Sequence, residues 1–255
     1  MTQKTFFRNL AGLLTAFLLH TATSAAQPAP PEQTMMSLRQ SIATAPNDSL
    51  KGLLYARVSE QFVYRSYKDA ENEAFRKPLL LQALVAVDSA LMFSKHPSIR
   101  AVRSIVVLDL ARYAPKGEAI VAVNVQKKEL EDILRVDTTN PEASITYGIL
   151  AYDVTAISGM QRFVAGLLFG KLPDDLTYQT ALLNLLQAKV QGAGDMPILY
   201  FKLAETYFAL KNNRDAIASL ETCIALPEKR PYIDAYFKGL AKKLLDDYRS
   251  KAAVK

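Results

Sequence analysis

Cysteine, histidine and tryptophan are scarce in this 255-residue chain, which has one cysteine, two histidines and no tryptophan. The single cysteine, Cys223, excludes an intramolecular disulfide. Its place on the apolar side of a helical pattern indicates a packing residue rather than a reactive thiol. His96, followed by Pro97, is the one histidine beyond residue 26. This composition excludes a zinc site of ordinary ligands, and we expect His96 to be a surface or helix-ending residue.

Motifs for catalysis and phosphate binding are lacking as well. Neighbouring carboxylates at 129–132, 174–175 and 246–247 fall at helix starts or on exposed faces, where capping or solvation accounts for them. The segment 192–194, Gly-Ala-Gly, is a turn and not a phosphate loop. We therefore expect a protein that is not an enzyme and needs no cofactor or metal. A carboxylate pair brought together in a pocket by folding would favour a hydrolase instead.

Long runs of basic residues are also missing, although the formal net charge is +6. Lys4 and Arg8 lie within residues 1–26, which hold no acidic residue, so the rest of the chain carries +4 (6 − 2). This modest excess is spread along the chain and does not favour nucleic-acid binding. Contact of a mildly basic surface with an anionic membrane or polymer remains an alternative.

Residues 1–26 have the pattern of a secretory signal peptide. Two basic residues precede an apolar run over 10–19, and small residues suitable for cleavage follow at 23–26. The apolar run is shorter than the roughly 20 residues that cross a bilayer. We expect an exported bacterial protein of the periplasm, with an uncleaved N-terminal anchor as the alternative. Residues 27–33 are rich in proline and predict a disordered leader.

The remainder of the chain, 34–250, has the composition and periodicity of helices. Half of the residues are apolar, glycine is scarce, and short breaks at Pro, Gly and Asn separate the amphipathic stretches. The expected helices cover 34–45, 49–68, 76–93, 98–113, 118–135, 142–157, 160–169, 177–191, the two halves of 196–226, and 231–249.

Residues 200–226 predict two short helices joined at 211–213. The first has the large and small residues of a tetratricopeptide first helix: Tyr200, Leu203, Ala204 and Tyr207. The second has the small-large-small spacing of its partner: Ala216, Leu220 and Cys223. One such unit cannot bury its own apolar face, so it needs neighbours. We predict an all-α, tetratricopeptide-like solenoid of about four helical hairpins with a C-terminal capping helix.

An insertion of about 21 residues separates the two helices of the third unit. Its residues and those that follow form a specific pattern: Arg162, Ala165, Leu168, Phe169, Gly170, Pro173, Thr177, Tyr178, Ala181 and Leu182. This pattern resembles the signature of the regulator of microtubule dynamics family, tetratricopeptide-like proteins with bacterial members. The resemblance implies the same helical fold over most of the chain. The microtubule role belongs to eukaryotic members and is not extended to an exported chain.

The first helices of tetratricopeptide units line a groove on the inner curve, which suits an extended peptide or a partner helix. Counting positions in the fourth and third units, and aligning the earlier units more loosely, predicts the groove residues Arg57, Arg103, Tyr152, Phe201, Glu205 and Phe208. The function expected from this groove is that of a non-catalytic scaffold for a protein or peptide partner.

Two alternatives concern the inserted helix 160–169: it fills the groove or leaves it open. A third is contact with a membrane through its apolar residues, although the basic face typical of such helices is missing. Two rival functions also stay open, a structural component of a cell-envelope complex and a cell-wall or peptide hydrolase. An apolar, uncharged outer face on 76–93 or 118–135 would favour the envelope complex.

Overall fold

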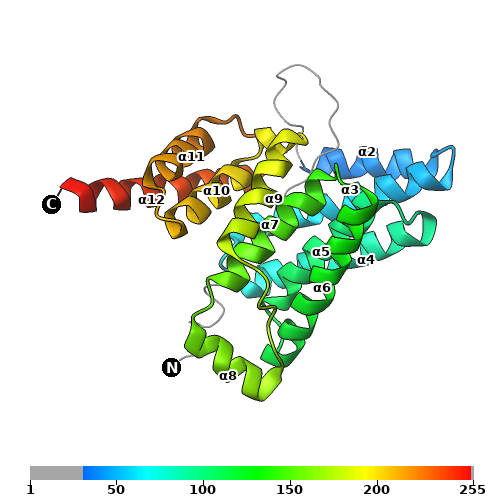
Figure 1. The fold of residues 1–255 in the computed structure, drawn as a ribbon. Coiled ribbons are helices and arrows are strands. Elements are labelled where there is room, and N and C mark those ends of the chain that lie inside the picture. Colours follow the sequence, from blue (N-terminus) through cyan, green and yellow to red (C-terminus); the bar gives the residue numbers. More distant parts are fainter. Residues whose placement is uncertain (1–30, 254–255) are drawn as a thin grey trace.

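The computed structural model describes residues 31–253. The expected signal segment and residues 27–30 of the leader lie outside this part. The described residues form eleven α-helices and two short 3-10 helices, without a strand (Figure 1). In chain order these are α2 (Pro31–Ala43), α3 (Asp48–Ser66), η1 (Tyr67–Asp69), α4 (Glu73–Phe93), α5 (Pro97–Ala111), α6 (Lys116–Val136), α7 (Pro141–Thr155), α8 (Gly159–Phe169), α9 (Tyr178–Val190), η2 (Ala193–Asp195), α10 (Pro197–Ala209), α11 (Asn213–Ala225) and α12 (Ile233–Ala253).

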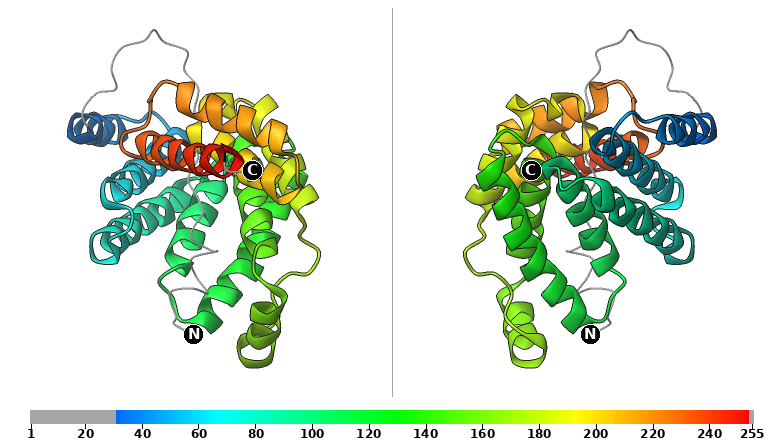
Figure 2. Two further views of the ribbon diagram at one scale, coloured as in Figure 1. Left: turned by 90° about the vertical axis from the view of Figure 1, so that its left-hand side faces the viewer. Right: turned by 90° about the vertical axis from the view of Figure 1, so that its right-hand side faces the viewer.

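The helices pack in sequential pairs, which confirms the predicted fold class. The four hairpins are α3 with α4, α5 with α6, α7 with α9, and α10 with α11. Each hairpin packs on the next, and together they follow an arch (Figure 2). Their buried aliphatic and aromatic residues form one continuous core.

Asparagine and proline set most helix starts. The side chains of Asn47, Asn72, Asn140 and Asn212 each accept a hydrogen bond from the backbone N–H three residues on. Three helices, α5, α7 and α10, have proline in the first turn, where its missing N–H has no helical partner to lose. The same tolerance lets α2 begin at Pro31, so the helix includes residues 31–33, which the sequence had assigned to the leader.

Close helix crossings depend on small residues. At Gly148 on α7, an added Cβ would lie 2.8 Å from Leu185 Cγ and 3.1 Å from the carbonyl oxygen of Ala181, both on α9. Ala181 and Leu185 are themselves fully buried. The small-large-small spacing recognised in the sequence thus marks a real contact between the two helices of one hairpin.

The inserted helix α8 lies beside α6 and points away from the rest of the arch (Figures 1 and 2). It therefore does not fill the concave side, which was one of the two arrangements expected for residues 160–169. Leu168 is exposed. No helix in residues 31–253 combines the length and apolarity needed to cross a bilayer.

The C-terminal helix α12 does more than cap the last hairpin. It packs on α10 and α11 and also reaches η1, near the N-terminal end of the arch. The Phe237 ring lies 5.7 Å from both Phe201 of α10 and Tyr67 of η1, and the Tyr236 hydroxyl donates to Glu71 at 2.9 Å. Figure 2 shows α12 crossing between the two arms of the arch. The first half of α12 therefore occupies part of the concave side.

Candidate functional site

A buried charge cluster lies between α7 and α10. The Lys202 side chain is 1% exposed, and its Nζ is 3.2 Å from Asp153 Oδ1 and 2.8 Å from Glu205 Oε2. The same Nζ is 5.0 Å from the centre of the Tyr152 ring. Asp153 is fully buried, whereas Glu205 and Tyr152 are only half-buried. One ammonium group thus lies between two carboxylates, of which the Glu205 side chain is partly exposed.

The cluster holds one negative charge more than positive when both carboxylates are ionised. Asp153 Oδ2 is buried and has no hydrogen-bond partner among the described groups. Burial raises the pKa of Asp153 to about 7, and the Lys202 charge opposes this shift. Burial also opposes the charge of Lys202, but Asp153 and Glu205 outweigh it and raise the Lys202 pKa. The protonation of Asp153 therefore changes near neutral pH.

The structure brings together four of the six predicted groove residues in two sets. Tyr152 and Glu205 meet around Lys202, as described. Phe201 and Phe208 of α10 face α12 instead: Phe201 is buried against Phe237, and the Phe208 ring lies 5.3 Å from that of Tyr248. Two of the predicted apolar contacts are thus occupied by the chain's own C-terminal helix.

The two predicted arginines lie elsewhere. Arg57 is half-buried on α3, where its charge acts on the neighbouring Glu60. Arg103 Nε donates to Asp88 Oδ1 of α4 at 2.7 Å. It also lines a depression of about 280 Å³ between α4, α5 and α6 with Leu91 and Val125. Arg103 therefore does not belong to the set formed by Tyr152 and Glu205.

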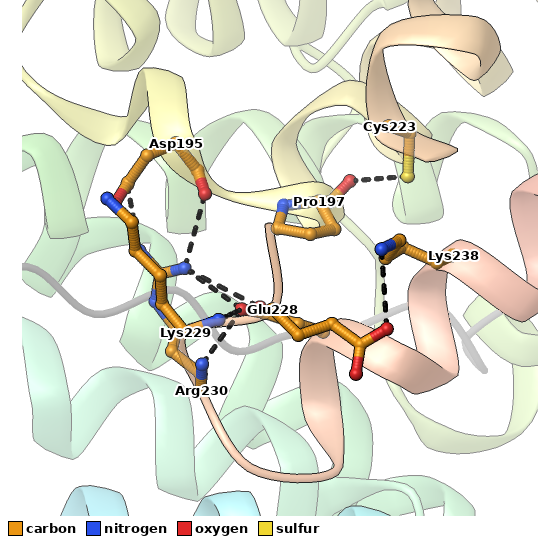
Figure 3. Close-up of polar contacts among 8 residues, drawn as sticks. Asp195, Pro197, Cys223, Glu228, Lys229, Arg230 and Lys238 are labelled. Carbon is orange, nitrogen blue, oxygen red and sulfur yellow. Dashed lines mark hydrogen bonds and ion pairs between the residues drawn. The ribbon is translucent and has the colours of Figure 1, made fainter. Parts of the chain in front are cut away.

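A second charge cluster holds the connection between α11 and α12 (Figure 3). Arg230 and Lys229 both pair with Asp195 of η2, at 2.8 and 3.0 Å. The backbone N–H groups of Lys229 and Arg230 donate to Asp234 Oδ2 at 2.8 and 2.9 Å. The Lys238–Glu228 ion pair lies on the same connection. These contacts fix where α12 begins and hence its course across the concave side.

Sequence reasoning did not identify Lys202 and Arg230 as buried. A charged residue in a helical pattern looks like a solvent-facing position, and one acidic partner of each is remote in the sequence: Asp153 lies 49 residues from Lys202, and Asp195 lies 35 residues from Arg230. Glu60 was missed for the same reason. Burial raises its pKa to about 8, opposed by Arg57 and reinforced by Glu142. The one sequence feature that could have indicated the Lys202 cluster was Asp153, because it directly follows the predicted groove residue Tyr152.

The remaining candidates for chemistry are structural. Cys223 is fully buried, its Sγ donates to the Pro197 carbonyl at 3.1 Å (Figure 3), and burial raises its pKa to about 12. His96 caps α5, because its Nδ1 accepts from the Ser98 N–H at 3.3 Å. Within residues 31–253, no group of three or more His, Cys, Asp or Glu is placed to bind a metal ion.

Comparison with known proteins identifies the family. The model of the family "Regulator of microtubule dynamics protein 1-3" matches residues 42–249, most of the chain. The chain belongs to the regulator of microtubule dynamics family. It is 30% identical over 101 residues to "Regulator of microtubule dynamics protein 2" of Homo sapiens and of Macaca fascicularis. That stretch is 40% of this chain and 24% of each relative, so the match spans about a quarter of the relatives' length.

The residues that suggested the regulator of microtubule dynamics family have structural roles around the insertion. Arg162 donates to the Val154 carbonyl at 2.7 Å and to the Pro173 carbonyl, which ties the end of α7 to the return loop. Gly170 ends α8 with φ +107°, a conformation that favours glycine. The Thr177 side chain caps α9. In this family member the signature therefore specifies how the insertion folds.

Proposed function

We propose that this protein is an exported, periplasmic scaffold without catalytic activity that binds a segment of another protein on its concave face. Membership of a helical-repeat family supports this role, because repeat folds present extended concave surfaces to partner chains. The relatives' name refers to microtubule dynamics. The export pattern of residues 1–26 supports a different partner for this chain.

The observation that carries the proposal is the half-buried pair Tyr152 and Glu205 beside the Lys202–Asp153 ion pair. The Glu205 side chain is 24% exposed, although its Oε2 is buried against Lys202, and the cluster has an excess negative charge when both carboxylates are ionised. A lysine or arginine of the partner would pair with Glu205 and lie near the Tyr152 ring. Phe208 packs against Tyr248 of α12, so the apolar contact at this site comes from the half-buried Tyr152 ring. The expected segment therefore combines a basic residue with apolar ones.

Selection from a phage-displayed random peptide library on the immobilised protein tests this function. We expect enriched peptides that share a basic residue flanked by apolar residues. Glu205→Gln should weaken their binding about tenfold or more, because a charge-assisted contact is lost. Arg103→Gln is the matched control, since Arg103 lies between α4, α5 and α6. Equal loss in both variants, or no enrichment of basic peptides, would refute the concave site.

A second candidate function is a structural component of a larger envelope assembly. The outer helices expose large apolar residues that a solvated surface does not require: Leu81, Val85 and Met92 of α4, Val121 and Val125 of α6, and Leu183 and Val190 of α9. Apolar surface of this kind is typical of faces that another chain covers. The outer face of 76–93 was the feature expected to favour this candidate.

A further inference from the structure

The solvent side of α4 is almost free of charge. Leu81, Val85 and Met92 are 47%, 68% and 84% exposed and recur at helical spacing along it. Between residues 78 and 92 the only charged residue is Asp88, which is already paired with Arg103 at 2.7 Å. We call this surface the α4 stripe: Pro78, Leu81, Gln82, Val85, Asp88, Ser89 and Met92. A stripe of this composition is suited to packing against another helix.

A groove runs beside the α4 stripe, between α2 and α4 and over α3. It has a volume of about 590 Å³. Apolar side chains from all three helices make up most of its lining: Ile42, Tyr55, Val58, Phe62, Leu81 and Val85. The side chain of Arg39 also lines it. The groove and the stripe share Leu81 and Val85, so one helix lying in the groove would contact both.

We propose that this helix is the α4 of a second copy of the chain, antiparallel to the first, so that two copies form a symmetric dimer. The α4 stripe is self-complementary about Val85. Pro78 and Met92 are equidistant from Val85 along the helix, so each would face the other across a twofold axis. Gln82 and Asp88 are also equidistant, and the amide donates to the carboxylate.

Charges at the two ends of α4 select the antiparallel orientation and a like partner. Glu73 is exposed at the start of the helix, where it also pairs with Lys77 at 3.8 Å, and Lys95 is exposed just beyond the helix end. At a rise of 1.5 Å per residue, Glu73 lies about 18 Å from Val85, and Phe93, where the helix ends two residues before Lys95, lies about 12 Å away on the opposite side. In the antiparallel pair each Glu73 stands near the Lys95 of the other copy, whereas a parallel pair would bring like charges together.

The dimer is independent of the concave-face proposal, because α4 packs mainly on α3 and α5, whereas Tyr152 and Glu205 lie on α7 and α10. It gives the outer-face apolar residues of α4 a specific role. Two other occupants of the groove are the alternatives: residues 1–30 of the same chain, or a different protein. Both predict a monomer of the purified chain.

Disulfide trapping of the full chain is the direct test. Val85→Cys places two thiols at the twofold axis, and oxidation should convert most of the protein to a covalent dimer on a non-reducing gel. The native Cys223 is buried and does not compete. Val121→Cys is the matched control, an exposed valine on α6. Equal trapping of the two variants would overturn the proposed interface.

Light scattering after size exclusion supplies the second readout. We expect the wild-type chain to have twice the mass of one copy at micromolar concentration, and Val85→Glu to be a folded monomer by circular dichroism. Glu73→Lys should weaken the dimer roughly tenfold, because two pairs become repulsive, and Glu73→Lys with Lys95→Glu should restore it. A wild-type monomer, or a dimer unaffected by Val85→Glu, contradicts the proposal.

Discussion

Gly148 lies where α7 crosses α9, and the space for a side chain there is already taken by Leu185 and the Ala181 carbonyl. Gly148→Ala should therefore destabilise the protein by about 1–3 kcal/mol, because overpacking outweighs the gain in helix propensity. Gly239 is the control, since a Cβ there meets nothing within 4 Å. Gly239→Ala should leave the free energy of unfolding unchanged or raise it by up to about 1 kcal/mol. Urea denaturation of both variants measures the difference, and equal effects would contradict the close crossing.

The inserted element depends on Arg162, whose guanidinium holds the carbonyl groups of Val154 and Pro173. Arg162→Met removes both hydrogen bonds, so the two carbonyl groups can bond only to water. We expect faster amide hydrogen exchange over 159–177, because α8 packs mainly on α6. Exchange in α10 and α11 should stay unchanged, since they lie in another hairpin. Uniform acceleration throughout the chain would show that the insertion is not a local unit.

The C-terminal element depends on Phe237, which contacts Phe201 of α10 and Tyr67 of η1. Phe237→Ala should cost about 3–5 kcal/mol, the usual range for a buried phenylalanine. Tyr248→Ala, further along α12, removes only the ring contact with Phe208 and should cost about 1 kcal/mol. Chemical denaturation monitored by circular dichroism compares the two. Similar losses of unfolding free energy in the two variants would mean that the contact at Tyr248 holds α12 as strongly as Phe237 does.

The helices and their pairing were predictable because they depend on residues that are close together in the sequence. Small residues such as Ala181 and Ala216 mark crossings, and asparagine or proline marks helix starts, so the pairs were found within a few residues of their observed bounds. The path of α12 was not predictable. Its apolar face had to be buried, but its sequence did not say that Phe237 would meet Tyr67, far away in the chain. The Lys202 cluster could not be predicted for the same reason, since Asp153 comes from a different helix, α7. Glu205 is on the same helix as Lys202, but its sequence position did not show that Lys202 is buried.

At the scale of the whole molecule, two buried carboxyls couple stability to pH. Burial raises the pKa of Glu60 to about 8 and of Asp153 to about 7. Arg57, Glu142 and Arg230 face Glu60, and Lys202, Glu205 and Arg112 face Asp153. The folded state holds these protons more tightly than the unfolded state, whose carboxyls titrate near 4. The stabilisation of the folded state by these two protonated carboxyls is therefore complete below about pH 4 and is lost as the pH rises to about 8.

We expect the Tm to fall between pH 6 and pH 8.5 for this reason. Glu60→Gln combined with Asp153→Asn removes both titrations and should flatten the dependence, whatever its effect on Tm at any one pH. Thermal unfolding across this range measures the slope. An unchanged slope in the double variant would show that other groups control it.

The hydrogen bond between Tyr236 and Glu71 joins residues 165 positions apart. During synthesis, Glu71 leaves the ribosome long before Tyr236 exists, so the first hairpin must wait for the last helix to complete its inner side. An open repeat array can mature hairpin by hairpin, but here the inner side of the first hairpin is completed only once residue 236 has been made.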